Sequence, residues 1–278
     1  MTVTEPWTCP TCNSTVSTPY CPDCGERPLR ARDLTLGGLF HQLVEALTHV
    51  DGRIMASFRC LVGRPGVLTV AYLRGQRKPY IGPVPLFLIA NALFFAAESL
   101  THGMVFTTPL DSHLHTQPWS PVAEVLVSHR LAARQTTLDI YAPIFERAVA
   151  INARSLIMVM ALSFVPVLSI VFHRSGRPLV AHAVLSLHLY AFLLLLFCVA
   201  TAVEYWLGGA GSVPESLDEV ISLTLLAACA TYLYIATGAV YAASGAIRVL
   251  KVATLTVAVA SIVLGYRFAL LLITLYLT

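Results

Sequence analysis

Four cysteines near the start of the chain have the spacing of a metal site. They form two Cys-x-x-Cys pairs, Cys9 with Cys12 and Cys21 with Cys24, separated by eight residues. Each pair can form a tight knuckle that directs two thiolates at one ion, and four sulfurs complete the tetrahedral shell that structural zinc prefers. Disulfides or a redox site are the alternative, but structural disulfides are rare in a reducing cytoplasm. We therefore expect a zinc ribbon and linker over residues 1–30, which folds around its metal and leaves no open position for catalysis.

A basic stretch lies just before the first long apolar run. Arg64, Arg74, Arg77 and Lys78 are its cations, and tyrosines are interspersed among them. Cations at a membrane surface attract anionic lipid headgroups, each contributing about 1 kcal/mol. The same charges also mark the cytoplasmic side of a membrane protein without binding anything selectively. Both interpretations remain open on the sequence.

Four polar side chains fall within apolar runs: Asn91, Glu98, His188 and Glu204. Ionisable groups at membrane depth are functional candidates, because burying them without a role is costly. Asn91 and Glu98 are seven residues apart, so they share one face of a helix. A polar site within the bundle is one prediction, and hydrogen bonding between helices is the simpler alternative. His182 lies six residues before His188, about 240° around a helix, so the two do not form a chelating pair.

A second candidate metal set lies between the first two apolar runs. His102, Asp111, His113 and His115 offer imidazole and carboxylate ligands for a divalent ion. The spacing is weak evidence by itself, and a solvated loop is the more ordinary interpretation. The three remaining cysteines, Cys60, Cys198 and Cys229, lie in apolar or amphipathic surroundings and are expected to be packing residues.

The composition determines what must position these residues. Hydrophobic residues make up 56% of the 278 positions and charged residues only 12%, against about 45–50% and about 25% in soluble domains. The apolar residues are grouped into runs of the length that crosses a bilayer. We therefore predict an all-α polytopic membrane protein with spans at residues 82–100, 155–173, 181–206, 220–243 and 251–273. A net charge of +3 is too small to indicate a nucleic-acid partner.

Charges in the short loops predict the orientation. The basic residues before the first span, between the second and third, and between the fourth and fifth all fall on one side, which is therefore cytoplasmic. The N-terminus is then expected to be cytoplasmic and the C-terminus extracytoplasmic. Arg267 interrupts the last apolar run, so that span is the least secure of the five.

The remaining segments are expected to lie at the membrane surface. Residues 31–80 predict amphipathic interfacial helices, including one from Leu36 to Val50, followed by the basic stretch. Residues 81–278 form the transmembrane domain, with an extracytoplasmic loop at about 101–154. Apolar positions near Val122 and between Leu138 and Ala148 suggest helices that rest on the membrane within this loop.

Several segments resemble one family of bacterial membrane proteins, catalogued as domain of unknown function 3667. They are the Tyr20-Cys21-Pro-Asp-Cys24-Gly25 knuckle, the stretch from Arg64 to Tyr80 and the segment from His182 to Phe192. The resemblance implies an N-terminal zinc ribbon joined to a helical membrane domain. It brings no assigned activity, substrate or catalytic residue.

Three classes of function follow from these features. The favoured hypothesis is a membrane-anchored docking protein that uses the cytoplasmic ribbon to bind a protein partner. A transporter, channel or lipid-handling protein is the alternative, using the polar residues of the bundle. A membrane-embedded enzyme is least favoured, because the sequence has no phosphate-binding glycine loop and no hydrolase or metalloprotease motif. Membrane lipids are expected partners, and the oligomeric state is left open.

Overall fold

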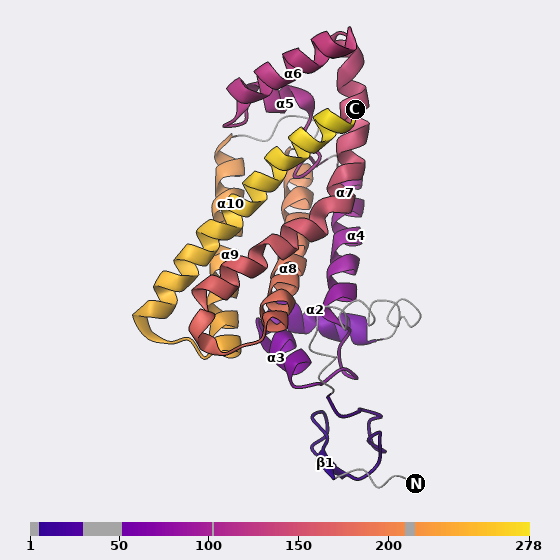
Figure 1. The fold of residues 1–278 in the computed structure, drawn as a ribbon, viewed down its shortest axis with the longest axis vertical. Coiled ribbons are helices and arrows are strands. Elements are labelled where there is room, and N and C mark those ends of the chain that lie inside the picture. Colours follow the sequence, from indigo (N-terminus) through magenta and orange to yellow (C-terminus); the bar gives the residue numbers. More distant parts are fainter. Residues whose placement is uncertain (1–5, 30–51, 102, 209–214) are drawn as a thin grey trace.

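The computed structural model describes residues 6–29, 52–101, 103–208 and 215–278. The predicted amphipathic helix over residues 36–50 lies outside these ranges. The described chain is arranged in tiers along its long axis: a small cysteine-rich unit, two short helices, a bundle of long helices, and two further helices at the opposite end (Figure 1).

Five helices are long and apolar enough to cross a membrane, as the sequence predicts. They are α4 (Pro83–Thr101), α7 (Leu138–Val171), α8 (Leu179–Gly208), α9 (Glu215–Tyr241) and α10 (Gly245–Leu277). Pro83 opens α4, where a proline's fixed φ suits the first helical turn and its missing N–H costs nothing. The chain is therefore an all-α polytopic protein.

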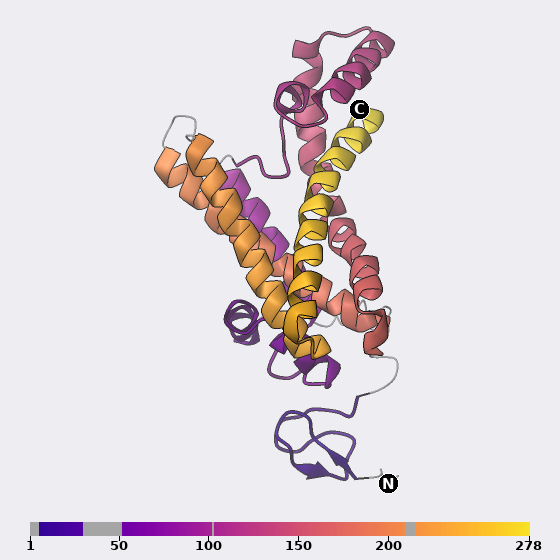
Figure 2. The same cartoon turned by 90° about the vertical axis from the view of Figure 1, so that its left-hand side faces the viewer.

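Helix α8 occupies the middle of the bundle. Two thirds of its most apolar window (67%) is buried by protein, against 39% or less for the other four spans. A helix that is surrounded by protein needs no polar face towards solvent. Every residue from 180 to 194 is buried. Helices α4, α7 and α9 pack directly on α8, and α10 packs on α7 and α9. Towards the end opposite the cysteines, α8 and α9 lean away from α7 and α10 (Figure 2).

The loop after the first span differs from the prediction in one respect. Helices α5 (Leu110–His115) and α6 (Ser120–Arg134) cover that end of the bundle. Residues 138–148, however, are not a separate surface helix, because they form the first turns of the continuous helix α7. No helix-ending signal separates Ala148 from the apolar run that follows. The short 3-10 helix η2 (His173–Ser175) then connects α7 to α8.

Two short helices close the other end of the bundle. Helix α2 (Arg53–Gly63) and helix α3 (Val67–Leu73) lie across it and contact α4, α8 and α9. Gly66 between them has φ +86°, and a Cβ at this position would meet the α9 backbone at Ala236, 2.9 Å away. Only glycine satisfies both the left-handed turn and this close approach.

The cysteine-rich unit, residues 6–29, is hereafter called the ribbon. Strand β1 (Trp7–Thr8) pairs antiparallel with strand β2 (Thr15–Val16), with Trp7 opposite Val16. Its buried apolar residues are only Cys9, Val16 and Cys21. So small a core cannot hold a fold of this size without a cross-link or a metal.

Candidate functional site

The four cysteines of the ribbon converge on one point. Their sulfur atoms all lie within 4.8 Å of one another. Cys9 Sγ is 3.5 Å from Cys24 Sγ, and Cys12 Sγ is 3.5 Å from Cys21 Sγ. All four are free thiols, with no disulfide among them. Within residues 6–29, 52–101, 103–208 and 215–278, this is the only group of three or more Cys, His, Asp and Glu side chains placed to hold a metal ion.

The two knuckles are built alike, and the sequence explains why. The N–H of Asn13 donates to the carbonyl of Cys9, and the N–H of Gly25 donates to the carbonyl of Cys21. Asn13 and Gly25 therefore occupy equivalent places after each pair, and both adopt positive φ, 61° and 70°. Glycine and asparagine are the residues that tolerate this conformation best. At the first knuckle, hydrogen bonding by Ser14 lowers the pKa of Cys12 to about 6, which favours the thiolate that a metal binds.

Glu26, which the sequence analysis did not single out, fastens the ribbon to the membrane domain. Its side chain is 2% exposed. The Oε2 atom accepts hydrogen bonds from the Thr11 hydroxyl at 3.0 Å, the Arg77 N–H at 2.9 Å and the Lys78 N–H at 3.1 Å. The side-chain amide of Gln76 also donates to the carbonyl of Pro10. We call these contacts the Glu26 clasp. Its only signal in the sequence is an acidic residue directly after Cys-x-x-Cys-Gly.

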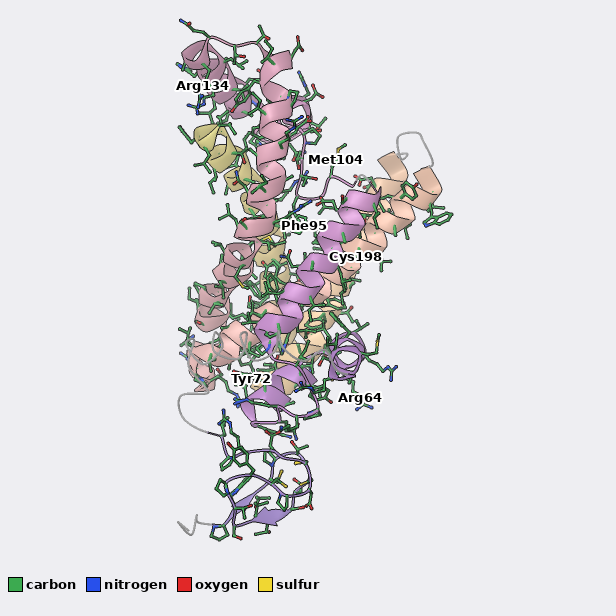
Figure 3. All side chains as sticks on the ribbon, turned by 90° about the vertical axis from the view of Figure 1, so that its right-hand side faces the viewer. Arg64, Tyr72, Phe95, Met104, Arg134 and Cys198 are labelled. Carbon is green, nitrogen blue, oxygen red and sulfur yellow. The ribbon has the colours of Figure 1, made fainter. Side chains whose placement is uncertain are left out.

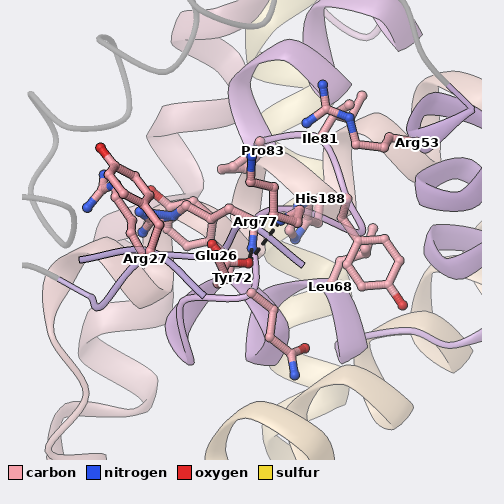
Figure 4. Close-up of a pocket in the computed structure, with 15 residues that line it drawn as sticks. Glu26, Arg27, Arg53, Leu68, Tyr72, Arg77, Ile81, Pro83 and His188 are labelled. Carbon is pink, nitrogen blue, oxygen red and sulfur yellow. Dashed lines mark hydrogen bonds between the residues drawn. The ribbon is translucent and has the colours of Figure 1, made fainter. Parts of the chain in front are cut away.

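A pocket of about 460 Å³ lies where the ribbon meets the membrane domain. Ribbon residues line one side, and residues from α2, α3, the start of α4 and α8 line the other. In Figure 4, Arg77 lies close to Glu26 and Tyr72, with Arg27 and Arg53 on opposite sides of it. We call this hollow the ribbon pocket.

The ribbon pocket divides the predicted basic stretch into two pairs. Arg77 and Lys78 line it, whereas Arg64 and Arg74 are exposed and do not. The Arg77 guanidinium carbon also lies 5.0 Å from the centre of the Tyr72 ring, in cation–π range. Figure 3 shows Arg64 at the ribbon end of the molecule and Met104 and Arg134 at the opposite end.

The two histidines of α8 are both hydrogen-bonded to other elements. His188 Nδ1 lies 2.8 Å from the Thr69 hydroxyl of α3, and both residues are fully buried. His182 Nδ1 lies 2.7 Å from the Tyr241 hydroxyl of α9. His188 is thus paired with a residue of the short helix α3. His188 also lines the ribbon pocket.

The other polar residues of the bundle do not join His188. Glu98 is buried near the opposite end, where Oε1 accepts from the Phe106 N–H at 3.1 Å and the Thr107 hydroxyl at 3.2 Å. Glu204 lies sixteen residues beyond His188 on α8, which is about 24 Å along a helix. Asn91 lines a groove on the outside of α4, together with Arg154 of α7. The four residues of the predicted intramembrane site therefore do not line one cavity. Glu98 and His188 each have a hydrogen-bond partner close by, whereas Asn91 lines a separate groove.

Arg267 also has a local partner. Its guanidinium donates to the Thr108 hydroxyl at 3.1 Å, and α10 continues through it to Leu277 without a break. The last span is therefore one continuous helix. Arg267 binds the loop before α5.

The histidines of the loop do not assemble a metal site in the described residues. His113 is buried, and its Nδ1 accepts from the Trp119 indole N–H at 3.2 Å. Burial, assisted by the nearby Arg267 charge, lowers the pKa of His113 to about 4. His115 is exposed and pairs with Asp111 at 3.0 Å. His102 lies outside the described residues. His113 is thus a structural residue that stays neutral.

Comparison with known proteins adds one finding. Residues 51–95 match a family model, described as a protein of unknown function (DUF3667). The resemblance expected from the sequence is confirmed over this segment, which comprises α2, α3, the clasp residues Arg77 and Lys78, and most of α4. The ribbon knuckle and the His182–Phe192 segment lie outside the match. Searches of curated proteins and of solved structures gave no match.

Proposed function

We propose that this chain is a bacterial inner-membrane protein whose cytoplasmic ribbon binds one structural zinc ion through Cys9, Cys12, Cys21 and Cys24. Tetrahedral zinc with bonds of about 2.3 Å places its sulfurs about 3.8 Å apart. Three of the six sulfur separations are 3.5 to 3.8 Å, and all six are within 4.8 Å, which is close to that geometry. Four thiolates leave no open position on the metal, so the ion stabilises the fold and does not activate water.

We further propose that the ribbon is a docking module for a cytoplasmic protein. The Glu26 clasp is the observation that supports this role. A flexible tether would leave the ribbon free to rotate, whereas a buried carboxylate with three donors holds it in one orientation on the membrane domain. Strand β1 lies at the end of the ribbon away from the bundle (Figure 1), and Thr15 of the paired strand β2 is exposed. A fixed, non-catalytic surface of this kind suits recognition rather than chemistry.

Site-specific photo-crosslinking in native membranes tests the docking role. A photoreactive residue at Thr15 should give one discrete crosslinked polypeptide, and Cys21→Ser, which removes a metal ligand, should abolish that band. The same photoreactive residue at Met104, which is 55% exposed at the opposite end of the molecule, is the matched control and should not give it. A chain that gives no polypeptide adduct at Thr15, or the same adduct with the ribbon unfolded, is not a docking protein of this type.

A lipid- or anion-handling role is the second candidate, and the ribbon pocket favours it. The dispersed polar residues of the bundle do not support a transport path, because they do not line a common cavity. The pocket, in contrast, is a single hollow at the ribbon end with cations on both of its sides. A ligand in the ribbon pocket would not require a protein partner on the ribbon.

A further inference from the structure

The ribbon pocket has a strong excess of positive charge. Among the residues that the structure describes, four cations line it, Arg27, Arg53, Arg77 and Lys78, against one carboxylate, Glu26. The Oε2 atom of that carboxylate accepts the three hydrogen bonds of the clasp. The cations also come from three separate parts of the chain: the ribbon, α2 and the segment between α3 and α4. The fold therefore assembles a concave cationic surface that no single segment of the sequence displays.

Neutral groups in the same pocket add to its affinity for an anion. The amino end of α4 lines it through Ile81, Gly82 and Pro83, and a helix carries partial positive charge at this end. Tyr20, which is 60% exposed, and Tyr80 also line it, and each carries a hydroxyl that can donate to an anion. Guanidinium forks combined with a helix amino end are typical of sites that hold phosphate oxygens.

The pocket lies at the level where lipid headgroups are expected. Helices α2 and α3 lie across the ribbon end of the spans (Figure 1). Apolar side chains of α2 remain uncovered by protein, notably Met55 at 63% and Val62 at 53% exposed. An amphipathic helix with such a face lies in the membrane interface. The pocket beside it is thus within reach of headgroups in the adjacent leaflet.

We infer that the ribbon pocket binds the phosphate group of an anionic ligand, and that its position favours a phospholipid headgroup over a soluble phosphate. Arg77 and Lys78 are assigned to the phosphate, with Arg27 contributing from the ribbon. The inference does not rest on the docking role, and it concerns a site at which no protein partner is needed. It also gives the segment that carries the family match a ligand-binding role.

Native mass spectrometry of the full chain released from nanodiscs tests this inference. The discs contain equal amounts of phosphatidylcholine and phosphatidylglycerol, and the ratio of the two retained lipids is measured. The intact chain should retain phosphatidylglycerol preferentially. Arg77→Gln with Lys78→Gln should reduce this preference by up to about thirtyfold, which is about 2 kcal/mol at 1.4 kcal/mol per factor of ten.

The basic stretch supplies a matched control. Arg64→Gln with Arg74→Gln removes the same charge from the same region but outside the pocket, and should keep the preference. Exchanging the charges, Arg77→Lys with Lys78→Arg, should also keep most of it. The substitutions leave the backbone N–H groups of the clasp in place, and bound zinc reports that the ribbon is folded. If the double variant loses zinc, Arg27→Gln replaces it.

A second arm distinguishes the source of the phosphate. Pyrophosphate is added to the chain in discs of phosphatidylcholine alone. A pyrophosphate adduct that the pocket variant loses, without any preference for phosphatidylglycerol, supports the site and assigns it to a soluble ligand. Retention of neither probe overturns the inference. Equal losses in the pocket variant and in the Arg64/Arg74 control also overturn it, because charge in general would then explain the binding.

Discussion

The two ends of the bundle use the same residue types with opposite results. At the ribbon end, a buried glutamate, a histidine and several arginines surround a hollow of about 460 Å³. At the loop end, Glu98, His113 and Arg267 each have a neighbouring partner within the loop that covers the bundle. Aromatic rings fill the space among them: Phe106 lies 5.5 Å from Phe94 and from Tyr266, centre to centre.

The comparison helps to distinguish polar residues that stabilise the fold from polar residues that could bind a ligand. Glu26 and Glu98 have the same structural role. The Glu26 carboxylate accepts backbone N–H groups of the segment after α3, and the Glu98 carboxylate accepts one from the loop after α4. Within the described residues, several cations also line a cavity beside the carboxylate at the ribbon end, whereas aromatic rings fill the space at the loop end. Polar residues inside a membrane protein are therefore informative only once their partners are known.

The largest expected effect is the loss of the metal from the ribbon. Cys21→Ser should reduce bound zinc from about one ion per chain to almost none, since structural zinc sites contribute on the order of 10 kcal/mol to the folding of such units. Elemental analysis measures the metal, and limited proteolysis should then cut within residues 6–29 while the spans stay intact. Cys198→Ser, outside the ribbon, should keep the zinc. Unchanged zinc in Cys21→Ser would mean that the ribbon is not the metal site.

The next effect concerns the contact that fixes the ribbon end to the spans. Gly66→Ala should destabilise the fold by about 3 kcal/mol, because it combines a positive φ with an overpacked approach to α9. The melting temperature in detergent measures it. Gly63→Ala is the matched control at the end of α2, where a Cβ meets nothing within 4 Å. Equal melting temperatures for the two variants would show that α3 does not pack on α9 as described.

Replacing each of the two buried glutamates in turn tests whether the two ends of the bundle are independent. Glu26→Gln should speed hydrogen exchange at the amides of Arg77 and Lys78, and Glu98→Gln should speed it at Phe106, by roughly tenfold to thirtyfold, or about 2 kcal/mol. Each variant should leave the other end unchanged. Asp23→Asn, an exposed ribbon carboxylate that bonds Ser14, should alter neither end. Faster exchange at both ends in either single variant would contradict the separation of the two regions.

The sequence predicts the spans well because their signal is local. Runs of about 20 apolar residues identify a spanning helix whatever packs beside it, and all five are present. The cysteine cluster is equally local, since two knuckles carry their own ligands. The sequence does not predict the continuous helix at residues 138–171, because the first turns of this helix are amphipathic and resemble a surface helix.

The Glu26 clasp and the ribbon pocket were not predictable in the same way. Glu26 contacts residues more than fifty positions away, and nothing in the spacing indicates which backbone N–H groups it accepts. Similarly, the cations of the pocket are scattered from Arg27 to Lys78, and they meet where the ribbon is hydrogen-bonded to the segment after α3. Asn91, Glu98, His188 and Glu204 show the converse. All four lie within apolar runs of the sequence, which suggested one site, but in the fold they do not line a common cavity, and His188 and Glu98 bind different segments.

The smallest expected effect is a response to acid at the loop end. His113 has a pKa of about 4 in the folded chain against an ordinary value of 6.5. Because the folded value is depressed, the stability that His113 contributes is present above about pH 6.5 and is lost as the pH falls towards 4. Between about pH 7.5 and about pH 6 the loss should be about 1 kcal/mol, and it should continue at lower pH.

The melting temperature at the two pH values measures this loss, and His113→Gln should reduce it. A protonated His113 can no longer accept the Trp119 indole N–H at Nδ1. Acid should therefore destabilise the loop end and leave the ribbon end unaffected. His115→Gln, at an exposed histidine only two residues away, should leave the acid response unchanged. If the intact chain and His113→Gln lose stability equally, the loop end is not closed around a neutral histidine, and the contrast between the two ends weakens.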